Sequence, residues 1–293
     1  MASIASTRRT VGSRTAPTSV KRVHVLDHGT LSLDRSIMLF GPTLATIDDP
    51  NRAAEWLTIP SYSVLIECDG HRILFDTGSH PDSEQRWPDA LKPVEVLNAT
   101  EECFLPNRLE QLKLRPSDVD IVVASHLHMD HSGCLEFFHD ARIVVHRDEL
   151  RSALEHYARV DGSTAYVKQD IESWIRNGLK WSIVDRSDPD FTLVPGVRVL
   201  NFGAGHVEGL LALLVELPGS GSLLLASDVC YAKSNLGPPP ALPGTASVFD
   251  SLGMVHAARR LIQTAEETGA EIWFGHDADQ YPTLIKAPDG FYE

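Results

Sequence analysis

Short apolar runs rich in valine, isoleucine and leucine alternate with amphipathic stretches over most of the chain. Such runs, bounded by glycine, proline, aspartate or asparagine, are typical of β-strands. The pattern predicts strands at residues 22–26, 63–67, 72–75, 120–124, 142–145, 182–184, 198–201, 211–217, 222–226 and 271–274. Turn residues at 68–71 and 218–221 predict hairpins between neighbouring strands of this set.

Apolar residues at helical spacing predict helices between these strands. The clearest is 250–268, where apolar residues recur every three or four positions and Gly269 follows as a stop signal. Further helices are predicted at 107–114, 148–157 and 170–177. Because strands and helices interleave without a linker, the sequence predicts a single α/β domain.

Two segments lack this periodicity. Residues 31–60 form a long predicted loop that mixes turn residues with Met38, Phe40 and Trp56. We expect this loop to be a flap whose apolar side chains line a substrate pocket. Residues 235–246 carry four prolines, which stiffen the backbone and suit a rigid wall beside a site.

Residues 1–20 are rich in serine, threonine and arginine and contain no acidic residue. Such a segment buries too little apolar surface to offset its ordering entropy, so we predict a flexible N-terminal arm before a domain at 21–293. Organellar targeting peptides share this composition, which leaves targeting open as an alternative. The segment has no secretory apolar core, and the expected location is the cytoplasm.

Composition narrows the class of protein. The 293 residues include 26 Lys+Arg and 40 Asp+Glu, a formal net charge of −14, which argues against nucleic-acid binding. No apolar run approaches the roughly 18–20 residues of a membrane span. The cysteines are widely spaced and form no CxxC pair, so they indicate neither a disulfide framework nor a thiolate zinc site. They are Cys68, Cys103, Cys134 and Cys230.

The chemistry-bearing motif follows the predicted strand 120–124 and reads His126-x-His128-x-Asp130-His131. In an extended stretch alternate side chains point the same way, so His126 and His128 can converge on one ion. Asp130 and His131 can then turn toward a neighbouring ion. Imidazole and carboxylate without thiolate suit Zn²⁺, with Mn²⁺ or Fe²⁺ as alternatives.

One loop cannot complete two coordination shells, so we expect further ligands at the ends of other strands. His206, Asp228 and His276 each follow directly on an apolar run. The small residues Gly203, Ala204 and Gly205 before His206 would let the backbone approach a metal closely.

This ordered set of residues resembles the metallo-β-lactamase superfamily, an α/β fold built as an αβ/βα four-layer sandwich with a dinuclear metal site at one edge. The resemblance covers nearly all of residues 21–293, and it implies two Zn²⁺ ions. It assigns His126, His128 and His206 to the first ion, Asp130, His131 and His276 to the second, and Asp228 as a bridge. Asp76, in Phe75-Asp76-Thr77-Gly78, would orient a ligand.

Within the superfamily, Asp228-Val229-Cys230-Tyr231 and the segment 275–280 are similar to the N-acyl-homoserine lactonases and to 4-pyridoxolactonase. The resemblance implies quorum-quenching lactone hydrolysis by a metal-bridging hydroxide. Tyr231 would stabilise the oxyanion, and Asp130 would deliver a proton to the leaving oxygen. The chain departs from the group at Val207-Glu208, where such enzymes commonly have Thr or Ser followed by Pro.

Two alternatives to this function stay open at this point. The substrate could be another small lactone or a cyclic amide, of the pyridoxolactone, γ-butyrolactone or lactam type. The protein could instead be non-hydrolytic, either an iron-dependent sulfur oxygenase or a metal-binding scaffold. The partner expected is a small-molecule lactone rather than nucleic acid or a membrane. The sequence leaves open whether the chain forms a homodimer, as related lactonases often do.

Overall fold

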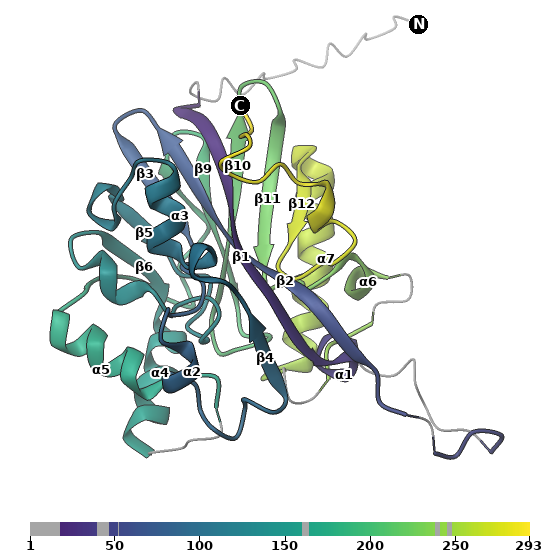
Figure 1. The fold of residues 1–293 in the computed structure, drawn as a ribbon. Helices are drawn as coiled ribbons and strands as arrows, with labels where there is room; N and C mark the ends of the chain where they lie inside the picture. Colours follow the sequence, from purple (N-terminus) through teal and green to yellow (C-terminus); the bar gives the residue numbers. More distant parts are fainter. Residues whose placement is uncertain (1–17, 40–46, 52, 160–163, 238–240, 245–247) are drawn as a thin grey trace, which may run out of the picture.

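Two β-sheets pack face to face and carry helices on their outer faces (Figure 1). The computed structural model describes residues 18–39, 47–51, 53–159, 164–237, 241–244 and 248–293. The helices are α1 (Arg35–Met38), α2 (Ser83–Arg86), α3 (Leu105–Gln111), α4 (Arg147–Arg159), α5 (Lys168–Asn177), α6 (Lys233–Leu236) and α7 (Ser251–Thr268). Short 3-10 turns are η1 (Glu101–Cys103), η2 (Pro116–Asp118), η3 (Leu135–Phe138) and η5 (Tyr281–Thr283).

The first sheet has the strand order β4-β1-β2-β3-β5-β6-β7. Its central strands β3, β5 and β6 run parallel to one another, and β1 and β2 form a long antiparallel ribbon beside them. The strands are β1 (Val20–Asp34), β2 (Trp56–Cys68), β3 (His71–Phe75), β4 (Glu95–Asn98), β5 (Ile121–Val123), β6 (Arg142–His146) and β7 (Lys180–Val184).

The second sheet has the order β12-β11-β10-β9-β8. Strands β9, β10 and β11 are antiparallel neighbours, whereas β12 pairs in parallel with β11 after the long helix α7. The strands are β8 (Phe191–Val194), β9 (Val197–Gly203), β10 (Leu210–Leu217), β11 (Gly221–Ser227) and β12 (Glu271–Phe274).

Side-chain alternation along β3 explains how the layers hold together. Ile73 and Phe75 pack in the core between the two sheets, while Leu74 between them packs toward α3, α4 and α5. Across the second sheet, Ala257 and Leu261 of α7 pack on β10 and β11. The layers are therefore helices, sheet, sheet and helix, which confirms the predicted four-layer α/β sandwich.

Several predicted boundaries were wrong because backbone pairing extends beyond the apolar runs. The predicted loop 31–60 is strand at both ends, since β1 continues to Asp34 and β2 already begins at Trp56. These ends alternate apolar and polar residues, as in Leu31-Ser32-Leu33-Asp34, and they pair in register. Strands β4 and β8 are short edge strands that the sequence did not indicate.

The predicted N-terminal arm lies outside the described residues up to position 17. The hydroxyls of Thr18 and Ser19 already donate to the second sheet, to the carbonyl oxygen of Glu216 in β10 and to that of Pro195 in the β8–β9 turn respectively. Of the proline-rich segment 235–246, positions 238–240 and 245–246 lie outside the described residues. Phe40 lies outside them as well.

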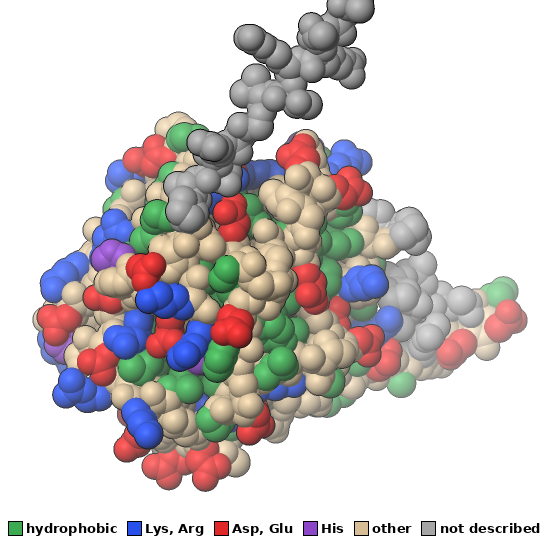
Figure 2. Space-filling view, turned by 90° about the horizontal axis from the view of Figure 1, so that it is seen from above, with side chains coloured by type: hydrophobic (Ala, Val, Ile, Leu, Met, Phe, Trp, Pro, Cys, Tyr) green, Lys and Arg blue, Asp and Glu red, His purple; other side chains and the backbone are tan. Residues whose placement is uncertain are grey.

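Three expectations about surface and thiols can be compared with this fold. All four cysteines are free, as predicted. Among the described residues, no helix is both long and apolar enough to cross a membrane. On the face seen in Figure 2, basic and acidic side chains are interspersed, and the expectation that the chain binds no nucleic acid stays a prediction.

Candidate metal centre

The loop that carries His126 to His131 leaves the carboxyl end of β5, a strand buried between β3 and β6. Backbone bonds give the loop its shape, because the carbonyl oxygen of His128 accepts from the N–H groups of both His131 and Ser132. The N–H of Thr77 donates to the carbonyl oxygen of His131, which ties the loop to the end of β3. The neighbouring strand ends therefore fix where the ligand side chains point.

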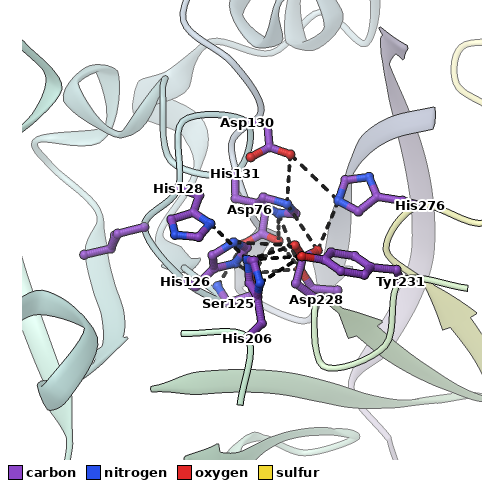
Figure 3. A network of polar contacts seen from close by, with 12 residues as sticks. Asp76, Ser125, His126, His128, Asp130, His131, His206, Asp228, Tyr231 and His276 are labelled. Carbon is purple, nitrogen blue, oxygen red and sulfur yellow. Dashed lines mark hydrogen bonds and ion pairs between the residues drawn. The ribbon is translucent and has the colours of Figure 1, made fainter. Parts of the chain in front are cut away.

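Three side chains from the second sheet complete the cluster. His206 follows β9, Asp228 follows β11 directly, and His276 lies just beyond β12. The two sheets bring these strand ends to the same edge, and Figure 3 shows the side chains converging on the loop from β5. The structure thus brings together all seven residues that the sequence predicts as metal ligands; their ligand role itself stays a prediction.

Asp228 lies between two groups of histidines. Its Oδ2 is 3.7 Å from Nε2 of His126 and 3.4 Å from Nε2 of His206. Its Oδ1 is 3.3 Å from Nε2 of His131 and 3.1 Å from Nε2 of His276. Each carboxylate oxygen therefore faces a different set of imidazoles, the arrangement that a carboxylate bridging two ions requires.

Buried polar atoms without a well-formed hydrogen bond indicate whether the cluster could hold cations. Nε2 of His126, Nε2 of His131 and Oδ1 of Asp228 are buried and, despite their short ion-pair distances, make no hydrogen bond of good geometry among the described residues. Orphaned buried polar atoms are costly, and metal coordination is one way to satisfy them. Three sets of potential ligand atoms lie within 4.8 Å of one another: His126, His128 and His206; His126, His131 and Asp228; and Asp130, His131 and His276. The residues therefore fit a pair of divalent cations.

Burial lowers the pKa of His126 and His128, whereas the carboxylates of Asp130 and Asp228 outweigh burial and raise the pKa of His131 and His276, so these two rings would release a proton on binding a metal. Burial, together with the neighbouring His206, lowers the pKa of His128 to about 3, so the ring is neutral at neutral pH. Burial alone would raise the pKa of Asp130, but the charges of His131 and His276 outweigh it and lower the value to about 2. Neutral imidazole and ionised carboxylate are the forms that coordinate cations.

Asp76 supports the cluster from β3. Its Oδ2 lies 3.0 Å from Nδ1 of His131 and accepts from the hydroxyl of Ser125 at 2.8 Å. Asp76 has a φ of 61°, a left-handed conformation that is costly for a residue with a Cβ. The geometry supports the predicted role of Asp76 in orienting a ligand, since a bond to Nδ1 leaves Nε2 of His131 facing the cluster.

Tyr231 lies at the edge of the cluster, three residues after Asp228. Its hydroxyl is 2.8 Å from Nδ1 of His206, and its ring packs tilted against His276 at a centroid distance of 5.6 Å. Its side chain is buried but lines the pocket described next. The hydroxyl therefore stands beside the predicted ions and within reach of a bound substrate.

A cavity of about 370 Å³ opens onto this cluster. One wall is apolar and comes from β1, α1, β2 and the segment before β4; it includes Leu33, Met38, Ile59, Leu91 and Val94. Another part of the lining is more polar and includes His156, Tyr166 and Glu208. Such a division suits a ligand with one polar and one apolar end.

Two pocket predictions can be compared with this cavity. Met38 is buried and lines the cavity, and its contact with a substrate stays a prediction. Trp56 was wrongly predicted to do so, because it is 52% exposed and pairs with Asp34 at the outer end of the β1–β2 ribbon. Its apolar character marks the start of a strand rather than a substrate wall.

Sequence reasoning missed three ionisable or phenolic residues at the cavity. Glu95 lies on β4, and Tyr166 and Glu208 line the polar side. Glu208 carried a signal, since it stands in the segment that departs from the pattern of similar enzymes. Glu95 and Tyr166 carried none, because their approach to the cluster depends on distant chain segments.

Comparisons with known proteins agree with this geometry. Residues 57–262 match the profile of the Metallo-beta-lactamase superfamily. The chain is 39% identical to an N-acyl homoserine lactonase, AiiB, of Rhizobium rhizogenes, over 93% of this chain and 99% of the relative. It is 38% identical to AiiB of Agrobacterium fabrum over the same shares. A solved N-acyl homoserine lactone hydrolase with N-hexanoyl-L-homoserine bound at its catalytic metal centre superposes with a TM-score of 0.77 at 26% identity, covering 94% of this chain and 100% of that one.

Proposed function

The chain belongs to the metallo-β-lactamase superfamily, and we propose that it is a hydrolase that opens the lactone ring of N-acyl homoserine lactones. The observation that carries this function is the position of Asp228, whose two oxygens face separate histidine groups beside the Tyr231 hydroxyl. The similarity to N-acyl homoserine lactonases over almost the whole chain selects the lactone among the substrates that such a site can hydrolyse.

The potential metal-ligating atoms of the chain favour two Zn²⁺ ions. His126, His128 and His206 would hold one, Asp130, His131 and His276 the other, with Asp228 shared. Nitrogen donors from five imidazoles with a few carboxylate oxygens suit zinc better than magnesium or calcium, which prefer oxygen. When bound, the cations would acidify a water molecule enough for it to act as the nucleophile at neutral pH, and would withdraw charge from the carbonyl.

Two protein groups would act on the substrate directly. The Tyr231 hydroxyl donates a hydrogen bond to the carbonyl oxygen, whose negative charge grows as the nucleophile adds. The Asp130 carboxylate faces the cavity, and its low pKa leaves it ionised and able to accept the proton that the water loses. Asp130 then passes this proton to the ring oxygen as the carbon–oxygen bond of the lactone breaks. The product is the N-acyl homoserine, and its new carboxyl group ionises at neutral pH and releases one proton to the solvent.

The cavity favours a substrate with an apolar tail. With the lactone at the cluster, the acyl chain would lie along the wall that includes Leu33, Ile59 and Leu91. Burying that chain stabilises the complex by about 0.8 kcal/mol for each methylene removed from water. The apolar wall therefore supports an acylated lactone over a small polar one.

A substrate panel with the zinc-loaded protein tests the function. The panel contains N-hexanoyl and N-decanoyl homoserine lactone, γ-butyrolactone, 4-pyridoxolactone and a cyclic amide, each followed by proton release. We expect hydrolysis of both acylated lactones, loss of activity with a chelator and recovery with zinc. Absence of activity on every lactone, or full activity after removal of all metal, would contradict the proposal.

A further inference from the structure

Glu149 is a buried carboxyl group in the first turn of α4, next to the ligand loop but not part of it. Its Oε1 accepts a hydrogen bond of 2.8 Å from the backbone N–H of Leu127. Leu127 stands between the two ligand candidates His126 and His128, so this single bond fixes the peptide from which both imidazoles project. A buried carboxyl in this place is expensive to desolvate, which argues for a specific role.

Tyr166 extends the contact from Glu149 to the ring of His128. The Tyr166 hydroxyl lies 3.1 Å from each carboxylate oxygen of Glu149. Its ring meets the His128 ring edge to face, with centroids 5.0 Å apart, and stacks on His156 from the other side. Glu149 therefore holds Tyr166 in the orientation that limits rotation of His128.

The same carboxyl group reaches the segment after His206. The backbone N–H of Gly209 lies near Glu149 and favours the ionised form of its carboxyl, and the Tyr166 hydroxyl lies 3.5 Å from Oε2 of Glu208. The other oxygen of Glu208 accepts a bond of 2.7 Å from the hydroxyl of Ser152, one turn along α4 from Glu149. The two ligand-bearing segments 126–128 and 206–209, which both contribute to the cavity lining, thus meet at one carboxyl group.

We propose that Glu149 is a positioning residue of the first metal site, which joins the His126–His128 loop to the segment after His206 through Leu127, Tyr166 and Gly209. This inference rests on the metal centre of the proposed function but not on the identity of the substrate. Hydrogen-bonded groups behind metal ligands commonly change metal affinity by about 10- to 100-fold when removed. Glu149 differs from such groups because it contacts the backbone of the loop that carries the ligands, at Leu127, rather than an imidazole nitrogen.

Zinc affinity and stoichiometry test the proposal without using activity. Wild type, Glu149→Leu, Glu149→Gln and the control Asp170→Leu are loaded with zinc and titrated with a competing chelator. Asp170 is also a buried helical carboxyl, on the neighbouring α5, and it pairs with Arg86 instead of the ligand loop. Thermal denaturation of each loaded protein reports on folding.

We expect Glu149→Leu to bind one zinc ion at least about tenfold more weakly than wild type and to retain the other. Glu149→Gln keeps an oxygen for Leu127 and should recover most of that loss. Asp170→Leu should lower the melting temperature with zinc affinity unchanged. Two ions bound by Glu149→Leu as tightly as by wild type, or an equal loss of affinity in Asp170→Leu, would overturn the inference. Wild type that binds no zinc would instead contradict the proposed function.

Discussion

Oδ2 of Asp76 lies 3.0 Å from Nδ1 of His131, and the same oxygen accepts hydrogen bonds from the hydroxyls of Ser125 and Ser227. One buried oxygen therefore sets the tautomer of a ligand candidate and links the ends of strands in both sheets. The other oxygen accepts from the backbone N–H of Ser125 at 2.7 Å. The two oxygens can be separated experimentally because an amide side chain preserves only one of them as an acceptor.

Asp76→Asn should weaken zinc binding by about 10- to 100-fold, since the amide nitrogen cannot accept the Nδ1–H of His131. Chelator competition measures this loss, and the exposed carboxylate Asp89 provides the control variant Asp89→Asn. Unchanged zinc affinity in Asp76→Asn would show that Asp76 supports the fold and not the metal centre.

Tyr231→Phe should reduce kcat for N-hexanoyl homoserine lactone by about tenfold. This factor corresponds to the loss of one hydrogen bond to developing charge, about 1.4 kcal/mol. The phenyl ring keeps the contact with His276 but loses the contact of the hydroxyl with Nδ1 of His206, so kcat is compared with zinc saturating and with both proteins holding the same zinc content. Steady-state kinetics and metal analysis on the same sample check both points; a wild-type kcat would remove Tyr231 from the reaction.

Glu95→Leu should favour substrates with longer acyl chains. Glu95 stands on β4 opposite Leu33, among the apolar residues of the cavity wall, and burial together with the nearby Asp130 raises the pKa of its carboxyl. Replacing this group with leucine should lower KM for the N-decanoyl substrate about fourfold, roughly the effect of burying one further methylene.

The KM of γ-butyrolactone, which has no chain, should not change in Glu95→Leu. The exposed residue Glu266 on α7 provides the matched control, Glu266→Leu. Equal changes in KM for the two substrates would place the acyl chain elsewhere in the cavity.

Asp170→Asn should flatten the dependence of stability on pH. Burial raises the pKa of Asp170 from 3.8 to about 7, and the bond to Arg86 offsets only part of that rise. Between about pH 4 and 7 the unfolded chain loses the proton while the folded protein keeps it. The free energy of unfolding therefore falls as pH rises through this window, by at most about 1.4 kcal/mol per pH unit from this group.

Denaturant unfolding of wild type and Asp170→Asn at pH 5, 6 and 7, with zinc saturating, gives the difference in stability at each pH. We expect the variant to gain relative to wild type with every step upward in pH. A constant difference would mean that Asp170 is ionised throughout the window.

The ligand set could be predicted because each member obeys a local rule. His206, Asp228 and His276 each come directly after an apolar run, and such runs become strands whose ends meet at one edge of a sandwich. The motif from His126 to His131 is contiguous, so its spacing alone indicates metal binding. No knowledge of strand order was needed for either step.

The supporting groups could not be predicted in the same way. Glu149 reads in the sequence as an ordinary acidic residue in a first helical turn, where the helix dipole favours negative charge. Its burial beneath Leu127 follows from the packing of α4 against the ligand loop. Trp56 shows an error in the other direction, a predicted role that the fold does not allow. Its apolar side chain suggested a pocket wall, whereas the β1–β2 pairing places it at the outer end of a ribbon.

The sequence by itself predicted the α/β class, the residues of the candidate metal centre and their position after strand ends, because periodicity and motif spacing are local properties of the chain. Only the tertiary structure decided which oxygen of Asp228 meets which histidines. It also decided that β4 brings Glu95 into the cavity wall and that Glu149 joins two ligand segments. These relationships depend on pairing and packing between residues far apart in the chain, and sheet order is set by the total burial that the whole fold achieves.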